Sequence, residues 1–431
     1  MNSPFFLDSG HMTVHSARSV DFKARVPGSK SLTNRFLLLA ALAEGRSRIT
    51  RPLESDDTRY MRQALADIGV TVACDGQDWV VNGHSKWHSP ANDIFVGNAG
   101  TVMRFFSPAL ALGPMSSVIT GNERMLVRPI GDLVEGLRQL GVTVNYKGEE
   151  GYPPLAISGP MNPGNISIRG DSSSQYLSGL LMTLPLLSSD SQISIEGDLV
   201  SRTYVEMTLN CMAGLGVQVD TGPEFKSFHI KGNQAYRAGD IDIEPDGSTA
   251  SYWFGLPLMV GGKVFVEGVP RTSTQGDFGL LEIIQKMGAS VTRTETGVWV
   301  ESAELSGVDV DMNTMSDVAP TIAVIATMAK TPTTIRNIYN MRIKECDRID
   351  TIKKAFDALG LKMEEGRDWM KIYPGKPDRD ALLNPEDDHR MAMIFALLGL
   401  AHGGVRIMDP DCVQKTYPAF YEEIGAAFQA S

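Results

Sequence analysis

One short pattern recurs along the chain at a nearly constant interval and limits the possible folds more than any other feature. A glycine between apolar residues stands at positions 69, 141, 216, 288 and 360, so the intervals are 72, 75, 72 and 72 residues. A less regular sixth copy is Ile424-Gly425-Ala426. A fixed period of this length indicates one supersecondary unit used repeatedly. We therefore expect these 431 residues to form six copies of one unit.

Each of these glycines follows an expected amphipathic helix. Leu280, Ile283, Ile284 and Met287 are spaced i, i+3, i+4 and i+7, which places them on one helix face. Glycine readily adopts the left-handed backbone conformation that ends a helix. Two alternating strands follow the glycine, as in residues 70–81. The repeat thus predicts an outer helix and a hairpin in every unit.

A second helix in each unit is apolar on nearly all sides, which is typical of a buried helix. These helices are expected at 36–42, 105–112, 177–187, 253–260, 322–329 and 391–401. The fold class is therefore mixed α/β. A polar stretch at Arg237–Asp246, between the third and fourth units, favours two lobes of three units over one ring. Residues 1 to about 17 precede the repeats and are expected to be peripheral.

Composition narrows the possible functions. The net charge is −11 and no long basic run is present, which argues against nucleic acid or a membrane surface as a partner. The longest apolar segments have 11 or 12 residues, fewer than the roughly 20 of a membrane span. The four cysteines are scattered along the chain, which is typical of proteins of the reducing cytoplasm. None forms a CxxC pair, which argues against a zinc site of common spacing. We expect a cytoplasmic protein without a metal.

The starts of the buried helices are the expected functional positions. They carry hydroxyl and small residues such as Gly28-Ser29-Lys30-Ser31, which are good helix caps but can also bind anions at the positive end of a helix. That segment is not a Walker A motif, because a serine separates its glycine from its lysine. Cations gather near the same boundaries: Lys30, Arg35, Arg104, Arg124, Arg128, Arg202, Arg342, Lys344, Arg348, Arg390 and Lys415. Together they predict a site for phosphate or carboxylate groups.

Nine segments resemble the 5-enolpyruvylshikimate-3-phosphate synthases, a family also called 3-phosphoshikimate 1-carboxyvinyltransferases. In family order they are VPGSKSLTNR (26–35), GNAGTVMR (97–104), RMLVRPI (124–130), SSQYLSGLLMTLPL (173–186), SRTYVEMTL (201–209), TQGD (274–277), RNIYNMRIKECDRI (336–349), DDHRMAM (387–393) and DPDCVQKTYPAFY (409–421). The resemblance implies a two-lobed inside-out α/β barrel of six βαβαββ units. It places shikimate 3-phosphate contacts in a lobe of 25–243, and the catalytic carboxylates and phosphoenolpyruvate-binding cations in 1–24 plus 244–431.

The resemblance also implies the reaction. The enolpyruvyl group of phosphoenolpyruvate moves to the 5-hydroxyl of shikimate 3-phosphate by addition and elimination, and phosphate leaves. This reaction belongs to the shikimate pathway to chorismate and the aromatic amino acids. We expect a monomer that needs no cofactor, because Lys and Arg can neutralise both anionic substrates.

Site residues carry over from the family motifs position by position. Asp317 resembles the base that takes the 5-hydroxyl proton and Glu345 the second proton-transfer group, with Lys30 assisting. Shikimate 3-phosphate contacts are implied at Lys30, Ser31, Arg35, Ser173, Ser174, Gln175, Ser201, Asp317, Asn340 and Lys344. Phosphoenolpyruvate contacts are implied at Lys30, Gly100, Arg128, Gln175, Arg348, Arg390 and Lys415.

One difference from the family motifs predicts a change in inhibitor sensitivity, and two alternative functions are open. The family motif has proline where this chain has Phe105, which predicts altered sensitivity to glyphosate, a competitor of phosphoenolpyruvate in this family. The sister transferase that uses UDP-N-acetylglucosamine shares the fold, but it carries a cysteine in the loop corresponding to 121–128, where this chain has none. The other alternative is an inactive repeat protein that only binds phosphorylated ligands.

Overall fold

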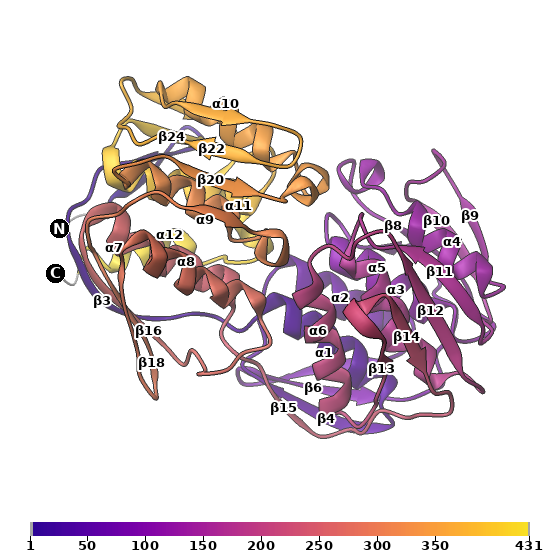
Figure 1. Cartoon of the computed structure of the whole chain (residues 1–431). Coiled ribbons are helices and arrows are strands. Elements are labelled where there is room, and N and C mark those ends of the chain that lie inside the picture. The colour runs from indigo at the N-terminus through magenta and orange to yellow at the C-terminus, as the bar shows by residue number, and fades with distance from the viewer. Residues whose placement is uncertain (1–2, 430–431) are drawn as a thin grey trace. The chain divides into compact units, whose positions relative to one another are not determined.

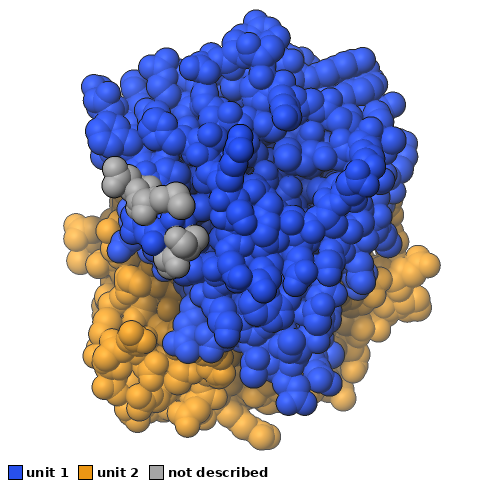
Figure 2. Space-filling model, turned by 90° about the vertical axis from the view of Figure 1, so that its left-hand side faces the viewer, with its two compact units in different colours: residues 1–27, 244–431 blue, residues 28–243 orange. Residues whose placement is uncertain are grey.

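A computed structural model describes residues 3–429 of the chain. The chain divides into two compact units, each with its own hydrophobic core. Unit 1 consists of Met1–Pro27 and Glu244–Ser431, and unit 2 of Gly28–Ile243 (Figures 1 and 2). The first division lies after residue 27 and not after residue 24 as expected, because strand β3 continues to Arg25.

The predicted fold class is confirmed, since six four-stranded sheets alternate with helices and each unit contains three sheets. In every sheet the first two strands are parallel, and the third and fourth continue antiparallel. The sheets of unit 2 are β15 (Asp240–Asp242), β4 (Gly45–Thr50), β6 (Asp78–Gly83), β5 (Thr71–Asp75); β7 (Ile94–Phe95), β8 (Ser116–Thr120), β10 (Leu155–Ser158), β9 (Thr143–Tyr146); and β11 (Asn165–Arg169), β12 (Ser191–Glu196), β14 (Ser227–Ile230), β13 (Asp220–Thr221). The sheets of unit 1 are β3 (Val20–Arg25), β16 (Gly262–Glu267), β18 (Gly297–Glu301), β17 (Ser290–Arg293); β19 (Asp309–Asp311), β20 (Thr333–Arg336), β22 (Met370–Ile372), β21 (Met363–Glu365); and β23 (Ala381–Leu383), β24 (Val405–Met408), β2 (His11–Val14), β1 (Phe5–Asp8).

The N-terminal hairpin completes the sixth repeat. That repeat ends with helix α12 and has no strands after it in residues 3–429, so β1 and β2 take the last two places of its sheet. Met12 of β2 pairs with Ile407 and Val14 pairs with Val405, and the side chains of Met12 and Val14 are both buried. The expectation that residues 1 to about 17 are peripheral is therefore wrong for β2, whose partner strand lies nearly 400 positions later in the chain. It holds for β1, an edge strand on which Phe6 and Leu7 are exposed.

One buried helix and one outer helix belong to each repeat, as predicted (Figure 1). The buried helices are α1 (Lys30–Leu42), α3 (Gly100–Leu110), α5 (Ser174–Thr183), α7 (Gly247–Val260), α9 (Ala319–Ile325) and α11 (His389–His402). The outer helices are α2 (Asp56–Asp67), α4 (Gly131–Gln139), α6 (Arg202–Gly214), α8 (Leu280–Met287), α10 (Arg348–Leu359) and α12 (Phe420–Ala426). Short 3-10 helices are η1 (Met125–Val127), η2 (Leu184–Leu186), η3 (Pro223–Phe225), η4 (Gly276–Gly279), η5 (Asn313–Met315), η6 (Ala326–Met328), η7 (Tyr339–Ile343) and η8 (Pro410–Lys415).

The repeated glycines end the outer helices by the expected mechanism. At positions 69, 141, 216, 288 and 360 φ is +95°, +78°, +90°, +113° and +75°, a conformation in which any other residue is strained. Gly425 instead lies within α12, which explains the irregular sixth copy. The described residues contain no helix that is both long enough and apolar enough to span a membrane.

Candidate active site

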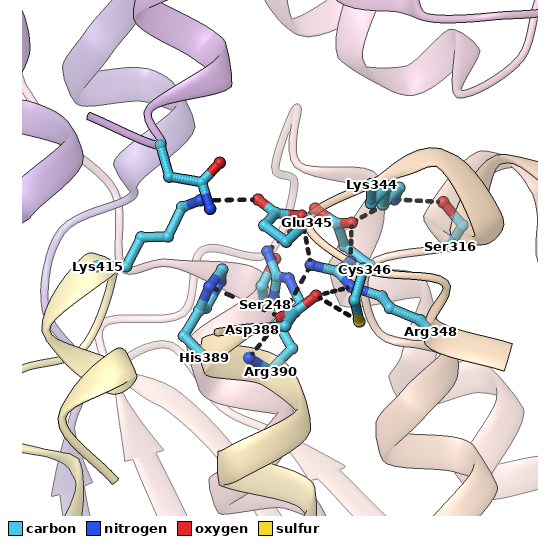
Figure 3. A network of polar contacts seen from close by, with 12 residues as sticks. Ser248, Ser316, Lys344, Glu345, Cys346, Arg348, Asp388, His389, Arg390 and Lys415 are labelled. Atoms are coloured by element: carbon cyan, nitrogen blue, oxygen red, sulfur yellow. Dashed lines mark hydrogen bonds and ion pairs between the residues drawn. The ribbon is translucent and has the colours of Figure 1, made fainter. Parts of the chain in front are cut away.

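The carboxylate of Asp317 lies among three cations of unit 1. These cations, Lys344, Arg348 and Arg390, are labelled in Figure 3. Oδ1 of Asp317 is 3.0 Å from Nη1 of Arg348 and also accepts from Nζ of Lys344, while its Oδ2 is 3.0 Å from Nη2 of Arg390. Lys344 follows η7, Arg348 begins α10, and Arg390 is in the first turn of α11. The helix starts named from the sequence thus bring these residues together.

These cations determine the protonation state of Asp317. Burial by itself raises the pKa of the Asp317 carboxyl, but Arg390, Lys344 and Arg348 lower it by more, so its pKa lies well below the ordinary value. Burial lowers the pKa of Lys344, and the nearby Asp317 carboxylate offsets part of this change. Asp317 is therefore ionised, and the three neighbouring cations balance its negative charge.

Glu345 joins Arg348 to Lys415. Its Oε2 is 2.9 Å from Nη2 of Arg348, and its Oε1 is 3.3 Å from Nζ of Lys415, which ends η8. Asn340 is buried within η7, in the same segment. Of the sequence-predicted residues in unit 1, Asp317, Lys344, Glu345, Arg348, Arg390 and Lys415 therefore form one continuous network.

The carboxylate of Asp388 holds the guanidinium of Arg348 in place through hydrogen bonds, a role that the sequence did not reveal. This fully buried carboxylate accepts from Nε of Arg348 at 2.7 Å and from Nη2 at 3.3 Å. It also caps α11 by accepting from the backbone N–H of Arg390 at 2.9 Å. Burial lowers the pKa of Arg348, but Asp388, Glu345 and Asp317 raise it by more, so the guanidinium stays charged. Only its position before a buried helix pointed to Asp388.

In unit 2, Arg128 lies against the start of α3. Its Nη1 donates to the carbonyl oxygen of Asn98 at 3.1 Å and to Oδ1 of the same residue at 3.0 Å. A Cβ atom on Gly100 would be 2.7 Å from Nη2 of Arg128, so only glycine leaves room for the guanidinium. Gly100 and Arg128, both predicted phosphoenolpyruvate contacts, are therefore neighbours.

The start of α5 lies beside α3, where Gln175 is hydrogen-bonded to Arg104. Of these two residues, only Gln175 was predicted to contact a substrate. Nη1 of Arg104 donates to Oε1 of Gln175 at 2.8 Å. Ser173 caps α5 by accepting from the backbone N–H of Gln175 at 3.3 Å, and Ser174 is buried in the first turn. Arg104 was recognised as one of the clustered cations but was not among the predicted contacts.

The remaining predicted residues of unit 2 lie at the starts of α1 and α6. Nζ of Lys30 is 3.1 Å from Oδ2 of the buried Asp57, and Ser31 follows in the first turn of α1. Ser201 caps α6 with a φ of +51°. The pairing of Lys30 with Asp57 could not be predicted from the sequence, because a carboxylate at the start of α2 is an ordinary helix residue.

Arg35 differs from the other predicted contacts because each of its three guanidinium nitrogens donates a hydrogen bond within unit 2. It donates to Oγ1 of Thr208 at 2.7 Å, to the Ser31 carbonyl at 2.9 Å and to the Tyr204 carbonyl at 3.0 Å. Its Cζ lies 4.9 Å from the centre of the Phe105 ring. Burial lowers the pKa of Arg35 to about 10. Arg35 thus joins α1 to α6, and its contact with shikimate 3-phosphate stays a prediction, as does the altered glyphosate sensitivity expected from Phe105.

The network in unit 1 consists of cations and carboxylates and not of metal ligands. Among residues 3–429, no group of three His, Cys, Asp or Glu side chains is placed to hold a metal ion. The network contains two carboxylates and four cations. Asp317 pairs with Lys344, Arg348 and Arg390, and Glu345 pairs with Arg348 and Lys415. Such an arrangement can bind an anion by exchanging internal ion pairs for ligand contacts.

Comparison with known proteins agrees with this chemistry. The sequence model of the EPSP synthase (3-phosphoshikimate 1-carboxyvinyltransferase) family matches residues 15–424. The 3-phosphoshikimate 1-carboxyvinyltransferase of Escherichia coli strain SMS-3-5 is 41% identical over 425 residues, which are 97% of this chain and 99% of that protein. The same enzyme of E. coli O1:K1 is 41% identical over 423 residues, again 97% of this chain and 99% of that protein.

Solved structures agree as well. EPSP synthase from Acinetobacter baumannii is similar with a TM-score of 0.80 and 25% identity, over 96% of this chain and 97% of that one. The enolpyruvyl transferase NikO from Streptomyces tendae, at 17% identity and a TM-score of 0.75 over 97% of both chains, supports the fold alone. The predicted function, enolpyruvyl transfer from phosphoenolpyruvate to shikimate 3-phosphate in the shikimate pathway, is confirmed at the level of the family. The chain belongs to the EPSP synthase (3-phosphoshikimate 1-carboxyvinyltransferase) family.

Proposed function

We propose that this chain carries out its family's reaction through the Asp317 network, with Asp317 as the base at the 5-hydroxyl of shikimate 3-phosphate. The observation that carries this proposal is the sharing of one partly buried carboxylate by Lys344, Arg348 and Arg390. A carboxylate of low pKa is a weak base, so the network as it stands holds Asp317 inactive. An anionic substrate that attracts those cations raises the pKa of Asp317.

The proton transfers follow from this assignment. Asp317 takes the 5-hydroxyl proton as the hydroxyl oxygen forms a bond to C2 of phosphoenolpyruvate, and Glu345 delivers a proton to C3. The tetrahedral intermediate then loses a proton from C3, the bond between C2 and the phosphate oxygen breaks, and inorganic phosphate leaves. We assign the second transfer to Glu345 from its position in the family motif of residues 336–349. Its contacts with Arg348 and Lys415 place it in the same network as Asp317. Lys30 is proposed to assist.

Substrate contacts are proposed for each unit separately. For shikimate 3-phosphate they are Lys30, Ser31, Arg35, Ser173, Ser174, Gln175 and Ser201 of unit 2, and Asp317, Asn340 and Lys344 of unit 1. For phosphoenolpyruvate they are Lys30, Gly100, Arg128 and Gln175 of unit 2, and Arg348, Arg390 and Lys415 of unit 1. The support for these contacts is the clustering of cations and hydroxyl groups at helix starts within each unit.

We further propose a cytoplasmic monomer without nucleic-acid or membrane partners. A net charge of −11 and four cysteines that are all thiols support this proposal. Size-exclusion chromatography with light scattering tests the monomer, since a mass near 94 kDa, twice 46.9 kDa, would contradict it.

Phosphate release from phosphoenolpyruvate tests the function. We expect release with shikimate 3-phosphate as acceptor and none with UDP-N-acetylglucosamine. Release with only the sugar nucleotide would replace the acceptor and keep the chemistry. No phosphate release with either acceptor, together with measurable binding of shikimate 3-phosphate, would favour a protein that only binds phosphorylated ligands.

A further inference from the structure

Ser248 connects Arg390 to a buried carboxylate outside the proposed catalytic network. Nη2 of Arg390 donates to Oγ of Ser248 at 3.2 Å (Figure 3). The Ser248 hydroxyl in turn donates to the carboxylate of Asp277. Ser248 is in the first turn of α7, Asp277 is in η4 and Arg390 is in α11. All three side chains are buried. A chain of contacts therefore runs from Asp277 through Ser248 to Arg390.

The carboxylate fixes the direction of this chain. A serine hydroxyl has one hydrogen and two lone pairs, and an ionised carboxylate can only accept. The Ser248 hydrogen is directed to Asp277. The lone pairs of its oxygen are therefore left for the Arg390 N–H group. The residue at position 277 thus decides what Ser248 presents to the guanidinium.

The segment that carries Asp277 is held firmly on the start of α7. Oε1 of Gln275 accepts from the Gly247 N–H at 3.0 Å, and its Nε2 donates to the Pro245 carbonyl at 2.8 Å. A Cβ atom on Gly247 would be 3.3 Å from Cβ of Asp277, so the two segments are in close contact. The side chain of Gln275 and the close approach at Gly247 therefore hold the Asp277 segment on α7.

Helix α7 supports Arg390 along one face. Tyr252 follows Ser248 by one helical turn, which places both on the same side. Burial raises the pKa of Tyr252 to about 12, and Arg390 is close enough to offset part of that rise. Nη2 of Arg390 also donates to Oδ2 of Asp317 at 3.0 Å. The guanidinium is thus held from α7 on one side and bonded to the proposed base on another.

We propose that Asp277, acting through Ser248, is a positioning residue that holds Arg390 in the orientation in which it receives phosphoenolpyruvate. This inference rests on the proposed function, because it takes Arg390 as a phosphoenolpyruvate contact. It adds two residues that touch neither the proposed substrates nor the reacting atoms. Their loss changes the affinity for one substrate and leaves the proton transfers intact.

Steady-state kinetics at pH 7.5 with both substrates varied tests the proposal. Ser248→Ala and Asp277→Ala are expected to raise KM for phosphoenolpyruvate about tenfold, the effect of losing one hydrogen bond to a charged group. KM for shikimate 3-phosphate and kcat stay within about twofold. Asp277→Asn keeps an oxygen that can accept the Ser248 hydrogen and is expected to retain most of the affinity.

Ser251→Ala is the matched control. Ser251 is a buried serine of the same helix, whose hydroxyl contacts the Ser248 carbonyl and Thr321. We expect wild-type KM values for it. The proposal fails if Ser248→Ala behaves like Ser251→Ala, or if it raises both KM values equally. If Asp277→Ala does not fold, Ser248→Ala alone decides between these outcomes.

Arg390→Lys separates this inference from the proposed function. The lysine keeps the charge but lacks the planar fork that Ser248 and Asp317 hold. A raised KM for phosphoenolpyruvate in Arg390→Lys with a normal one in Ser248→Ala overturns only the positioning role. A normal KM in Arg390→Lys overturns the assignment of Arg390 itself, and the positioning role with it.

Discussion

The guanidinium of Arg128 lies where the side chain of any residue other than glycine at position 100 would begin. A Cβ atom on Gly100 would be 2.7 Å from Nη2 and 2.9 Å from Cζ of Arg128. Arg128 also donates two hydrogen bonds to Asn98, so its head is fixed from two directions. A methyl group at position 100 must therefore displace an arginine that we assign to phosphoenolpyruvate.

Gly100→Ala is expected to raise KM for phosphoenolpyruvate about tenfold or more, because the displaced guanidinium loses hydrogen bonds to charged groups. The measurement is KM for each substrate. Gly214→Ala is the control, since Gly214 is also helical and a Cβ there meets no atom within 4 Å. It should keep normal kinetics and gain stability, by about 0.5–1 kcal/mol. Equal KM values in both variants would show that Arg128 adapts freely.

Asp317→Asn is expected to lower kcat by about two to four orders of magnitude, the range for loss of a general base. The amide has the same shape but cannot take a proton from the 5-hydroxyl. Single-turnover kinetics with folded protein measures the effect. Asp309→Asn, which removes an exposed carboxylate paired with Arg336, is the control and should not change turnover. A near-normal rate in Asp317→Asn would require another base.

Asp388→Asn is expected to lower the free energy of unfolding by about 3 kcal/mol, because it leaves the buried Arg348 without its closest counter-charge. Asparagine also caps helices, so the start of α11 keeps its cap and the loss reports the ion pair. Urea denaturation gives the value. The control is again Asp309→Asn: the pair of Asp309 with Arg336 is shorter, at 2.6 Å against 2.7 Å, but exposed. Exposed pairs contribute about 0–1 kcal/mol, so similar losses in the two variants would contradict the role of burial.

Asp277 is expected to make stability depend on pH. Burial, followed by repulsion from Asp317, raises its pKa to about 6 in the folded protein, against 3.8 ordinarily. The folded state therefore binds the proton more tightly, and the stability that this proton contributes below pH 4 is lost as the pH rises through 6. Asp277→Asn does not titrate. Its stability relative to wild type should thus improve between pH 4.5 and 7.5, by about 2 kcal/mol.

Urea denaturation of both proteins at the two pH values measures this change. Asp309→Asn is the control and should change little between these pH values. Hydrogen bonding to Arg336 lowers the pKa of Asp309 from its ordinary 3.8, so this carboxyl is already mostly ionised in both the folded and the unfolded state at pH 4.5. A difference between wild type and Asp277→Asn that does not change with pH would mean that the Asp277 carboxyl titrates normally.

Much of the fold follows from short stretches of sequence. The spacing of Leu280, Ile283, Ile284 and Met287 predicts one apolar face, and all four side chains are buried in α8. The glycines at the ends of the outer helices need a positive φ whatever surrounds them, so five of the six could be recognised from the period alone. The family motifs likewise identified Lys344, Glu345, Arg348 and Arg390, and the family resemblance also named Asp317. These five residues lie in one network.

By itself, the sequence determined the repeated unit, its two kinds of helix and the residues at the helix starts, because helix periodicity and capping depend on neighbours within a few positions. The tertiary structure decided which distant groups meet. It placed the N-terminal hairpin in the sixth sheet, Asp388 behind Arg348, and Ser248 beside Arg390 at a separation of 142 positions. Such contacts depend on how the buried helices pack, and an ion pair or a hydroxyl bridge between them has no period in the sequence.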